Sequence, residues 1–460
     1  MRTQGSRGSV RKLAAGVLPA LAFWFGAQGA MAQTAPAAGE VLFSKGVGFA
    51  QQPGQNARTL GKGLPLQPGD TLSTAADATA IVQLQDGTKL TLRPGTELQL
   101  EQYQYRAGAS DNSMVMQLLR GGLRAITGLI SKGSPNAARI KTPTATIGIR
   151  GTDFDARLCT SDCAQEDARH PERPRQMSIG ASAKLAQIQG EMTARRANGE
   201  ARRVVEGGGL FPGDTVETAP GTRAVVVFRD NSRVTLGPQT QLRVDDFVFD
   251  DRNPSDGRFL VSLLRGTARA LTGLIGKANQ RNVAFKTPTA TIGIRGTGLD
   301  MACGDAECSY FVWQGQIEVT PTQGAGGQPG SAIVLSEGEG VRLGPQGQAP
   351  QGESPIPSLV RPDGVTIDLG PLFEMIEPYL GESGLFVVVR EGHIELTTAT
   401  GVLQLGPGEV GRVNPQQLLA RVQSVPPSAD FDGIPKPDVK NPLLFLILGE
   451  SGVRTSEQCK

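Results

Sequence analysis

Polar and apolar residues alternate along many short segments of the chain. Residues 80–84 (AIVQL), 89–92 (KLTL) and 97–101 (ELQLE) follow one another, with Asp86-Gly87 and Pro94-Gly95 between them. A period of two is typical of half-buried β-strands, and Asp-Gly and Pro-Gly pairs are typical of the turns that join them. The pattern predicts an all-β fold with strands of four or five residues and a few short helices.

The segment at residues 114–130 fits two assignments. Residues 114–119 predict a strand, Arg120-Gly121-Gly122 interrupts it, and residues 123–130 fit either a strand or a short helix. Gly128 favours the strand, because a glycine inside a helix costs about 1 kcal/mol relative to alanine.

A long internal repeat organises the rest of the chain. Residues 141–152 (KTPTATIGIRGT) return unchanged as residues 286–297, which is 145 positions later (286 − 141). Upstream segments repeat as well: residues 118–130 match 263–275, and residues 69–98 match 213–242. The chain is therefore a tandem duplication, and repeats that cannot bury a core alone stack on their neighbours.

Further segments extend this pattern. Residues 185–192 are predicted to close the first unit and open the second, and residues 385–413 repeat a hairpin pattern that we expect to cap the array. Pro371 opens a short helical pattern. Residues 425–442 carry five prolines and predict an extended tail, and residues 443–448 fit a strand docked on a sheet edge.

The first 32 residues predict a cleavable signal peptide. Basic residues precede an apolar run at residues 13–27, and Ala30-Met31-Ala32 fits a cleavage site before Gln33. The apolar run is shorter than the ~20 residues that a membrane-spanning helix needs, although an uncleaved anchor is the alternative. We therefore expect a periplasmic or secreted protein with no transmembrane segment in its mature chain.

The charge of the mature chain argues against nucleic acid as a partner. The sequence has 46 Lys and Arg residues and 44 Asp and Glu residues. The predicted signal peptide carries four of the basic residues, so the mature chain has a net charge of about −2 (46 − 4 − 44). A slightly acidic chain has no overall field that attracts phosphates.

The arginine of the repeated motif has two interpretations. In the first, the guanidinium of Arg150 or Arg295 hydrogen-bonds turn carbonyls and locks the motif in place. In the second, Arg150 and Arg295, with Thr152 and Thr297, are binding residues for a ligand or a partner.

The order of these motifs resembles the FecR domain, which is named for the periplasmic part of the ferric-citrate signalling regulator. The resemblance covers most of residues 40–345 and implies two extracytoplasmic, solenoid-like β-domains without catalysis that are used for protein contact. The signalling regulator has a cytoplasmic anti-sigma segment and a membrane helix where this chain has a predicted signal peptide, so a free-standing exported type is expected. The family's signature falls on Gly69, Asp70, Thr74, Asp86, Gly87, Thr142, Pro143, Gly148, Arg150, Gly151 and Thr152, and in the second copy on Gly213, Asp214, Thr218, Asp230, Thr287, Pro288, Gly293, Arg295, Gly296 and Thr297.

The repeat and the resemblance together predict the limits of the domains. The predicted order is residues 1–32 as signal peptide, 33–185 as the first FecR-like domain, 186–345 as the second, 346–413 as a linker, short helix and partial third repeat, and 414–460 as a Pro-rich tail.

Four of the five cysteines form two close pairs at corresponding places of the repeat. The pairs are Cys159 with Cys163 and Cys303 with Cys308, and in an exported protein such pairs predict local disulfides. A zinc site is disfavoured, because His170 and His393 lie far away in the sequence. Cys459 is left over, as a free or an intermolecular thiol.

Enzymatic chemistry finds little support in the sequence. Two histidines leave few general bases near neutral pH, and no nucleophile elbow or phosphate loop is present. We expect no catalytic residue, metal or cofactor. The hypothesis is a non-enzymatic exported protein of the cell envelope that acts as a protein-binding, scaffolding or sensory module, with another envelope protein as its partner. The alternative is a carbohydrate-binding or glycan-acting surface protein.

Overall fold

The computed structural model describes residues 37–448, apart from 134–136, 170–174, 177–179, 198, 200, 323–329, 346, 374 and 376–382. The predicted signal peptide and Cys459 lie outside the described residues. Among the helices of the described part, none is both long enough and apolar enough to cross a membrane.

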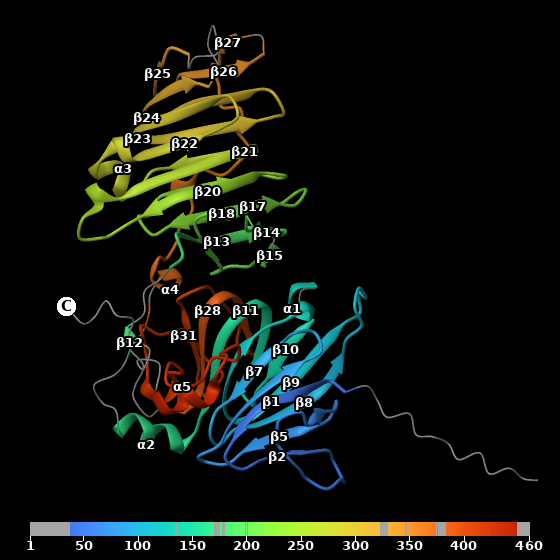
Figure 1. The fold of residues 1–460 in the computed structure, drawn as a ribbon. Coiled ribbons are helices and arrows are strands. Elements are labelled where there is room, and N and C mark those ends of the chain that lie inside the picture. Colours follow the sequence, from blue (N-terminus) through green and yellow to red (C-terminus); the bar gives the residue numbers. More distant parts are fainter. Residues whose placement is uncertain are drawn as a thin grey trace, which may run out of the picture. The chain divides into compact units, whose positions relative to one another are not determined.

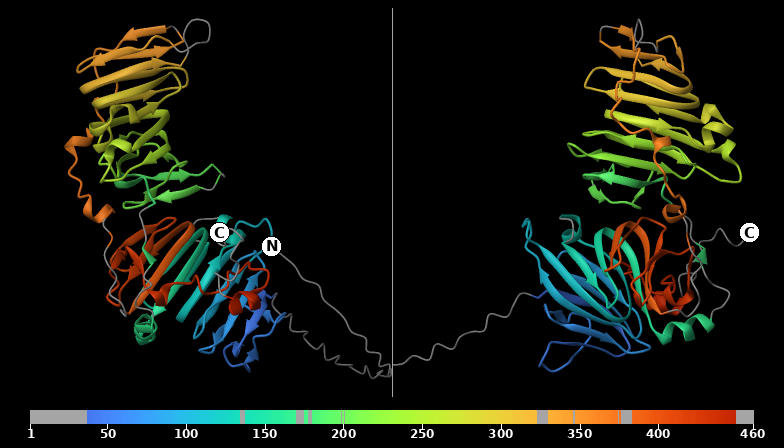
Figure 2. Two further views of the ribbon diagram at one scale, coloured as in Figure 1. Left: turned by 60° about the vertical axis from the view of Figure 1, so that its left-hand side comes forward. Right: turned by 180° about the vertical axis from the view of Figure 1, so that it is seen from behind.

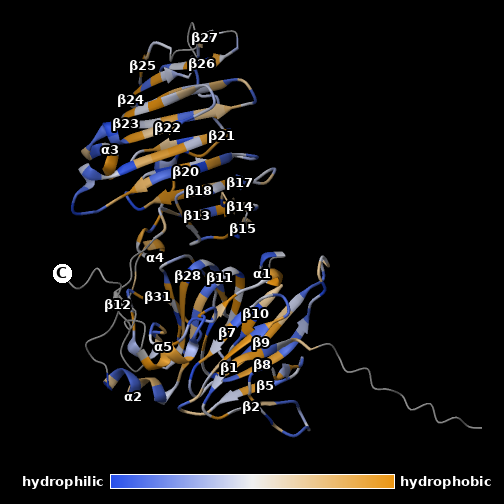
Figure 3. Ribbon diagram, viewed as in Figure 1, coloured by the Kyte–Doolittle hydropathy of each residue, from blue (hydrophilic) through white to orange (hydrophobic). Residues whose placement is uncertain are grey.

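The fold is all-β, as the alternating pattern predicted, and consists mainly of two sheets of fifteen strands each (Figure 1). We call each sheet with the core it encloses a β-unit. Apolar residues alternate with polar ones along the longer strands (Figure 3), so that one side of these strands faces the core.

The first β-unit begins with the N-terminal third of the described chain. Its elements are β1 (Gly39–Lys45), β2 (Gly48–Gln51), β3 (Arg58–Thr59), β4 (Pro65–Leu66), β5 (Thr71–Thr74), β6 (Thr79–Leu84), β7 (Lys89–Leu92), β8 (Glu97–Gln104), β9 (Ser113–Ile126), α1 (Leu129–Gly133), β10 (Ala138–Lys141), β11 (Thr146–Cys159) and α2 (Ser161–Arg169).

The second β-unit repeats this order. Its elements are β13 (Ala183–Gln189), β14 (Met192–Arg195), β15 (Ala201–Val204), β16 (Gly209–Leu210), β17 (Thr215–Thr218), β18 (Arg223–Phe228), β19 (Arg233–Leu236), β20 (Gln241–Val248), η1 (Pro254–Asp256), β21 (Arg258–Leu271), α3 (Leu274–Ala278), η2 (Gln280–Asn282), β22 (Val283–Lys286), β23 (Ala290–Cys303), β24 (Cys308–Pro321), β25 (Ile333–Ser336), β26 (Gly340–Gly344) and β27 (Gly347–Pro350).

The C-terminal part holds η4 (Pro362–Gly364), α4 (Gly370–Phe373), β28 (Gly384–Thr397), β29 (Val402–Leu405), β30 (Val410–Val413), β31 (Leu419–Arg421), β32 (Ser424–Val425), η5 (Pro427–Ala429) and α5 (Pro442–Leu448). Strand β32 pairs with β12 (Arg175–Gln176) in a separate two-stranded sheet.

The longest strands bend in the middle and contribute to both sides of a core. The first half of β9 pairs with β8, and its second half pairs with β7. In β28 the bend falls at Gly392, which has a φ of +77° and lies so close to β11 that a Cβ there would be 2.2 Å from the carbonyl oxygen of Gly151. Only glycine fits such a position without strain. The bent strands thereby fold each sheet over its own apolar interior.

The first sheet is completed by strands from the far end of the chain. Strand β28 pairs with β11 along almost its whole length, as β24 pairs with β23 in the second sheet. Figures 1 and 2 show β28 (red) beside β11 (green) from several sides. The expectation that residues 385–413 cap the array as a third repeat is therefore wrong, and so is the assignment of residues 185–192 to the closing hairpin of the first unit. Residues Ala183–Gln189 instead open the second sheet by pairing with β16 and β18.

Two irregular segments cover the outer faces of the sheets, and we call them straps. The first strap, residues 422–435, packs Val422, Val425 and Ala429 against apolar residues of β28 and against the Cys159–Cys163 pair. The second strap, residues 353–373, packs on the outer face of β18. The predicted extended tail at residues 425–442 is therefore wrong over the strap, because Phe431 is fully buried there.

The short apolar segments are also corrected by the structure. Residues 442–448 form helix α5 and not a strand. The segment at residues 114–130 contains a strand that continues through Arg120-Gly121-Gly122 to Ile126, followed by helix α1. Helix α4 begins at Gly370, next to the predicted Pro371.

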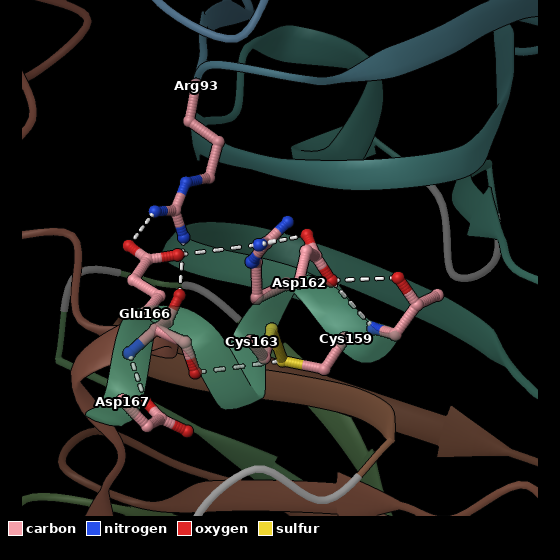
Figure 4. The surroundings of a disulfide bond; sticks show 9 residues. Arg93, Cys159, Asp162, Cys163, Glu166 and Asp167 are labelled. Atoms are coloured by element: carbon pink, nitrogen blue, oxygen red, sulfur yellow. Dashed lines mark hydrogen bonds and ion pairs between the residues drawn. A yellow bond between two sulfur atoms is a disulfide. The ribbon is translucent and has the colours of Figure 1, made fainter. Parts of the chain in front are cut away.

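Both predicted disulfides are present. Cys159–Cys163 joins the end of β11 to α2, and Cys303–Cys308 joins β23 to β24. Around the first bridge, Glu166 of α2 accepts a hydrogen bond from Arg93 at 2.5 Å, and Asp167 accepts one from the backbone N–H of Ser428 at 2.7 Å (Figure 4). The bridge therefore fixes a helix that ties the first strap to the sheet.

Removing the first bridge is expected to destabilise the first β-unit. The double substitution Cys159→Ala/Cys163→Ala should lower the free energy of unfolding by about 2 kcal/mol, because a bridge over so short a loop removes little entropy from the unfolded chain. Thermal unfolding followed by circular dichroism measures the change, and wild type treated with a reductant, which also opens Cys303–Cys308, should melt no higher than the variant. Equal melting temperatures with and without reductant would contradict this expectation.

Candidate functional site

The repeated Thr-Pro-Thr motif forms a tight turn that starts a long strand. Thr142 Oγ1 accepts a hydrogen bond from the backbone N–H of Ala145 at 3.0 Å and lies 3.0 Å from its carbonyl oxygen. Thr287 makes the same pair of contacts with Ala290 in the second β-unit. Pro143 lies in the turn, as expected for a residue that cannot donate to a ladder.

The Arg-Gly-Thr end of the motif is the bend of that strand. Gly151 and Gly296 have φ values of +53° and +71°. Thr152 is buried, and its Oγ1 donates to the carbonyl oxygen of His393 at 2.9 Å, while Thr297 Oγ1 donates to the carbonyl oxygen of Gln316 at 2.6 Å. The structure thus places both predicted threonines where they fasten the bent strand to its neighbour.

The aspartates of the motif order are also buried in contacts with their own β-unit. Asp70 pairs with Arg58, and Asp214 pairs with Arg202, in each case close to the start of the unit. Asp86 accepts hydrogen bonds from Thr88 and from the backbone N–H of Ile130 at the start of α1. These residues explain why the motif order specifies the fold.

The predicted arginines lie at equivalent places in different sheets. Arg150 is paired in register with His393 of β28, and Arg295 with Gln316 of β24. Arg150 also lines a cavity of about 100 Å³ where strands of the first sheet meet the start of the second. We call it the junction cavity. Its lining residues are Gly148, Ile149, Arg150, Arg202, Arg203, Gly209, His393, Ile394, Glu395, Gln404 and Leu405.

Phe211 and His393 form the apolar side of this junction. Their rings meet edge to face with centroids 5.4 Å apart, and the Arg202 guanidinium lies 5.8 Å from the centre of the Phe211 ring. Burial, with the nearby charges of Arg202, Arg196 and Arg150, lowers the pKa of His393 to about 2. The imidazole is therefore neutral at physiological pH and a poor base.

The protonation of His393 predicts a pH dependence of stability. The unfolded chain takes up a proton near pH 6.5, whereas the folded chain does so only near pH 2, so the free energy of unfolding falls as the pH drops below 6.5. The expected loss between pH 6.5 and 4.5 is about 2 kcal/mol.

Urea denaturation at several pH values measures this loss. His393→Gln provides the matched control, because the second β-unit has Gln316 at the equivalent position opposite Arg295. The variant should lose this part of the pH dependence. An unchanged slope in the variant would assign the effect to other groups.

A buried ion pair next to the cavity joins the two β-units. Lys184 Nζ of β13 lies 3.0 Å from Glu409 Oε1, and the two side chains are 0% and 1% exposed. Arg421 adds a second cation, with Nε 3.7 Å from the same carboxylate oxygen. This pair could not be predicted from the sequence, because a lysine and a glutamate 225 residues apart carry no sign of their pairing.

The junction cavity offers limited chemistry. Its volume of about 100 Å³ is well below the roughly 300–1,000 Å³ that is usual for a small-molecule site. Arg202 is committed to Asp214 by two hydrogen bonds, and Gln404 bridges to Glu395 and to the backbone of Arg203. Within the described ranges, no three His, Cys, Asp or Glu side chains are grouped as a metal site.

Comparison with known proteins points to one family. A family model described as FecR protein matches residues 70–166 and 214–318. No curated protein matches the chain. Two crystal structures of a candidate anti-sigma factor from Parabacteroides distasonis are similar in part, each with 18% sequence identity and a TM-score of 0.24 over 31% of this chain and 61% of that chain. The chain thus spans about three fifths of the length of that protein.

Proposed function

Because this chain belongs to the FecR family through two tandem copies of the domain, we propose that it is a non-enzymatic protein-binding module of the cell envelope with a sensory or scaffolding role. The predicted signal peptide and the two disulfides support a place outside the cytoplasm. The partner is another envelope protein, and the contact is made through strand edges.

The observation that carries the proposal is an uncovered sheet edge. Strand β27 ends the second sheet, and all four of its residues are exposed. An exposed edge presents backbone donors and acceptors that pair readily with a strand of another chain. The charged residues of the junction cavity, in contrast, are largely engaged within the fold, which favours protein contact over chemistry on a small substrate.

Site-specific photocrosslinking in intact envelopes tests this function. A photoreactive residue at Gln348 of β27 should capture one defined envelope protein. The same group at Asp251, an exposed loop residue far from the edge in sequence, should not. Capture at both positions, or at neither, would contradict binding through this edge.

Arg150→Ala, combined with the Gln348 probe, separates the edge from the junction cavity. Unchanged capture is expected, since Arg150 lies in the first sheet and Gln348 in the second. Loss of capture in a variant that still folds would place the binding site at the cavity instead.

A further inference from the structure

The two β-units end in equivalent edges, of which one is occupied and one is open. In the first unit, the N–H of Gly406 donates to Glu409 Oε2 at 3.0 Å. In the second, the N–H of Ser336 donates to Glu339 Oε2 at 2.8 Å. Strands β28 and β24 confirm that Glu409 and Glu339 are equivalent. The N–H of Val389 in β28 donates to the carbonyl oxygen of Glu409, and that of Val312 in β24 donates to the carbonyl oxygen of Glu339. We call the turn with its glutamate the closing edge of each unit.

The closing edge of the first unit is the surface on which the second unit is seated. The fixed carboxylate of Glu409 turns its Oε1 to Lys184 of β13. Gln404 of the same edge accepts a hydrogen bond from the N–H of Val205 at 3.3 Å. The junction is therefore built from a preset glutamate on one unit and a lysine on the first strand of the next.

The closing edge of the second unit keeps the same preset glutamate but faces solvent. Glu339 is exposed, and over the described ranges it forms no ion pair. Val334, which stands at the place of Gln404, is 50% exposed. In the first unit, Gly411 pairs with Arg421, which supplies the additional cation. The equivalent of Gly411 in the second unit is Val341, which pairs with the uncharged Pro350.

Neither opening strand of this chain fits that open edge. Strands β1 and β13 open the two units, and Glu40 of β1 is equivalent to Lys184 of β13. The strand pairing shows this equivalence, because Glu40 pairs with Pro65 of β4 and Lys184 pairs with Gly209 of β16. A second copy would therefore bring Glu40 against Glu339, and like charges repel.

The opening of the second unit fails for a steric reason. Phe211 packs on Gly406, where an added Cβ would lie 2.0 Å from the phenyl ring. The open edge has Ser336 at this place, so its Cβ would collide with such a phenylalanine. Gln67 of the first unit is equivalent to Phe211 of the second. The backbone N–H of Gln67 donates to Asp70, and that of Phe211 donates to Asp214, in each case three residues later.

We propose that the closing edge around Val334, Ser336 and Glu339 docks a β-domain of the same type on another protein. That domain carries a lysine at the place of Lys184 and no aromatic residue at the place of Phe211. The inference rests on the proposed protein-binding function and names the class of partner. The stabilising contact is an ion pair like that between Lys184 and Glu409. The N–H of Ser336 already holds the carboxylate of Glu339 as the N–H of Gly406 holds that of Glu409.

Purified full-length chains test the edge without the natural partner. The variant Glu40→Lys/Glu339→Lys has a lysine at the place of Lys184 and keeps Gln67 at the place of Phe211. Its second substitution replaces the acidic residue of its own closing edge by a basic one. Both substituted residues are exposed, so the fold should be retained. Mixed with wild type at about 100 μM, where a weak interface is populated, it should shift the sedimenting species from monomer to a 1:1 complex.

Three controls make the result decisive. Replacing the wild-type chain by Glu339→Gln should abolish the complex. The variant Asp251→Lys/Glu339→Lys has the same charges at another site and should not bind wild type. Each protein alone should be monomeric.

Absence of a complex between the lysine variant and wild type would overturn the proposal. Self-association of wild type that Glu339→Lys abolishes would also overturn it, because the occupant would then be a second copy. The result is independent of the envelope crosslinking. If the complex forms but no envelope protein is crosslinked at Gln348, the proposed function is wrong and the inference about the closing edge stands.

Discussion

Replacing Arg269 by methionine should lower the free energy of unfolding of the second β-unit by about 3–5 kcal/mol, because it leaves a buried carboxylate without its cation. Arg269 Nε and Nη2 bind Asp300 Oδ1 and Oδ2 at 2.6 and 2.7 Å, and Asp300 is completely buried. Arg269 also donates to the carbonyl oxygens of Leu359 and Ile356, so the same substitution removes hydrogen bonds that hold the second strap.

Urea denaturation followed by tryptophan fluorescence measures this loss. Once the predicted signal peptide is removed, Trp313 is the only tryptophan in the sequence, and the Arg361 guanidinium of the second strap lies 4.0 Å from the centre of its ring. The double variant Arg269→Met/Asp300→Asn removes both charges and should recover more than half of the loss. A cost below about 1 kcal/mol for Arg269→Met would show that water reaches Asp300.

Replacing Lys184 by methionine should cost about 3 kcal/mol and loosen the contact between the β-units. Glu409 would remain buried, with only the more distant Arg421 to balance its charge. Hydrogen exchange should accelerate at Gly406 and Val205, whose N–H groups are bonded at the junction.

The first β-unit supplies a matched control for this substitution. Glu40 is equivalent to Lys184 but exposed, so Glu40→Met should change the free energy of unfolding by no more than about 0.5 kcal/mol. Lys184→Met/Glu409→Gln should be more stable than Lys184→Met alone. If both single variants cost the same, the buried pair contributes nothing specific to the junction.

The class of fold was predictable because it depends on local patterns. The period of two in segments such as Ala80–Leu84 is a local property, and so is the proximity of Cys159 and Cys163. Because residues 141–152 and 286–297 are identical, the local structure expected for one unit could be expected for the other as well. These features gave the all-β class, the duplication and both disulfides.

The pairing of distant segments was not predictable in the same way. Residues 384–397 have the pattern of a strand, but a strand pattern does not name its partner, and β28 joins β11 across the whole second unit. Residues 443–448 are uniformly apolar, which suits a short helix as well as a strand.

The candidate site was predictable only in part. Arg150 was singled out by its motif, whereas the residues that line the junction cavity with it, His393 and Arg202, lie far from it in the sequence and carry no sign that they meet it. Lys184 lies in a strand pattern and would ordinarily face solvent. Its burial follows from the way in which one unit is seated on the other.

The position of β28 reverses the order in which the two units can mature during synthesis. All strands of the second sheet lie between Ala183 and Pro350, so that unit has its full set of strands once Pro350 has been made. The first sheet lacks β28 until Thr397 has been made, and β11 presents an unpaired edge until then. The N-terminal unit is thus the last to be completed, and β11 lacks its partner strand while the whole second unit is made.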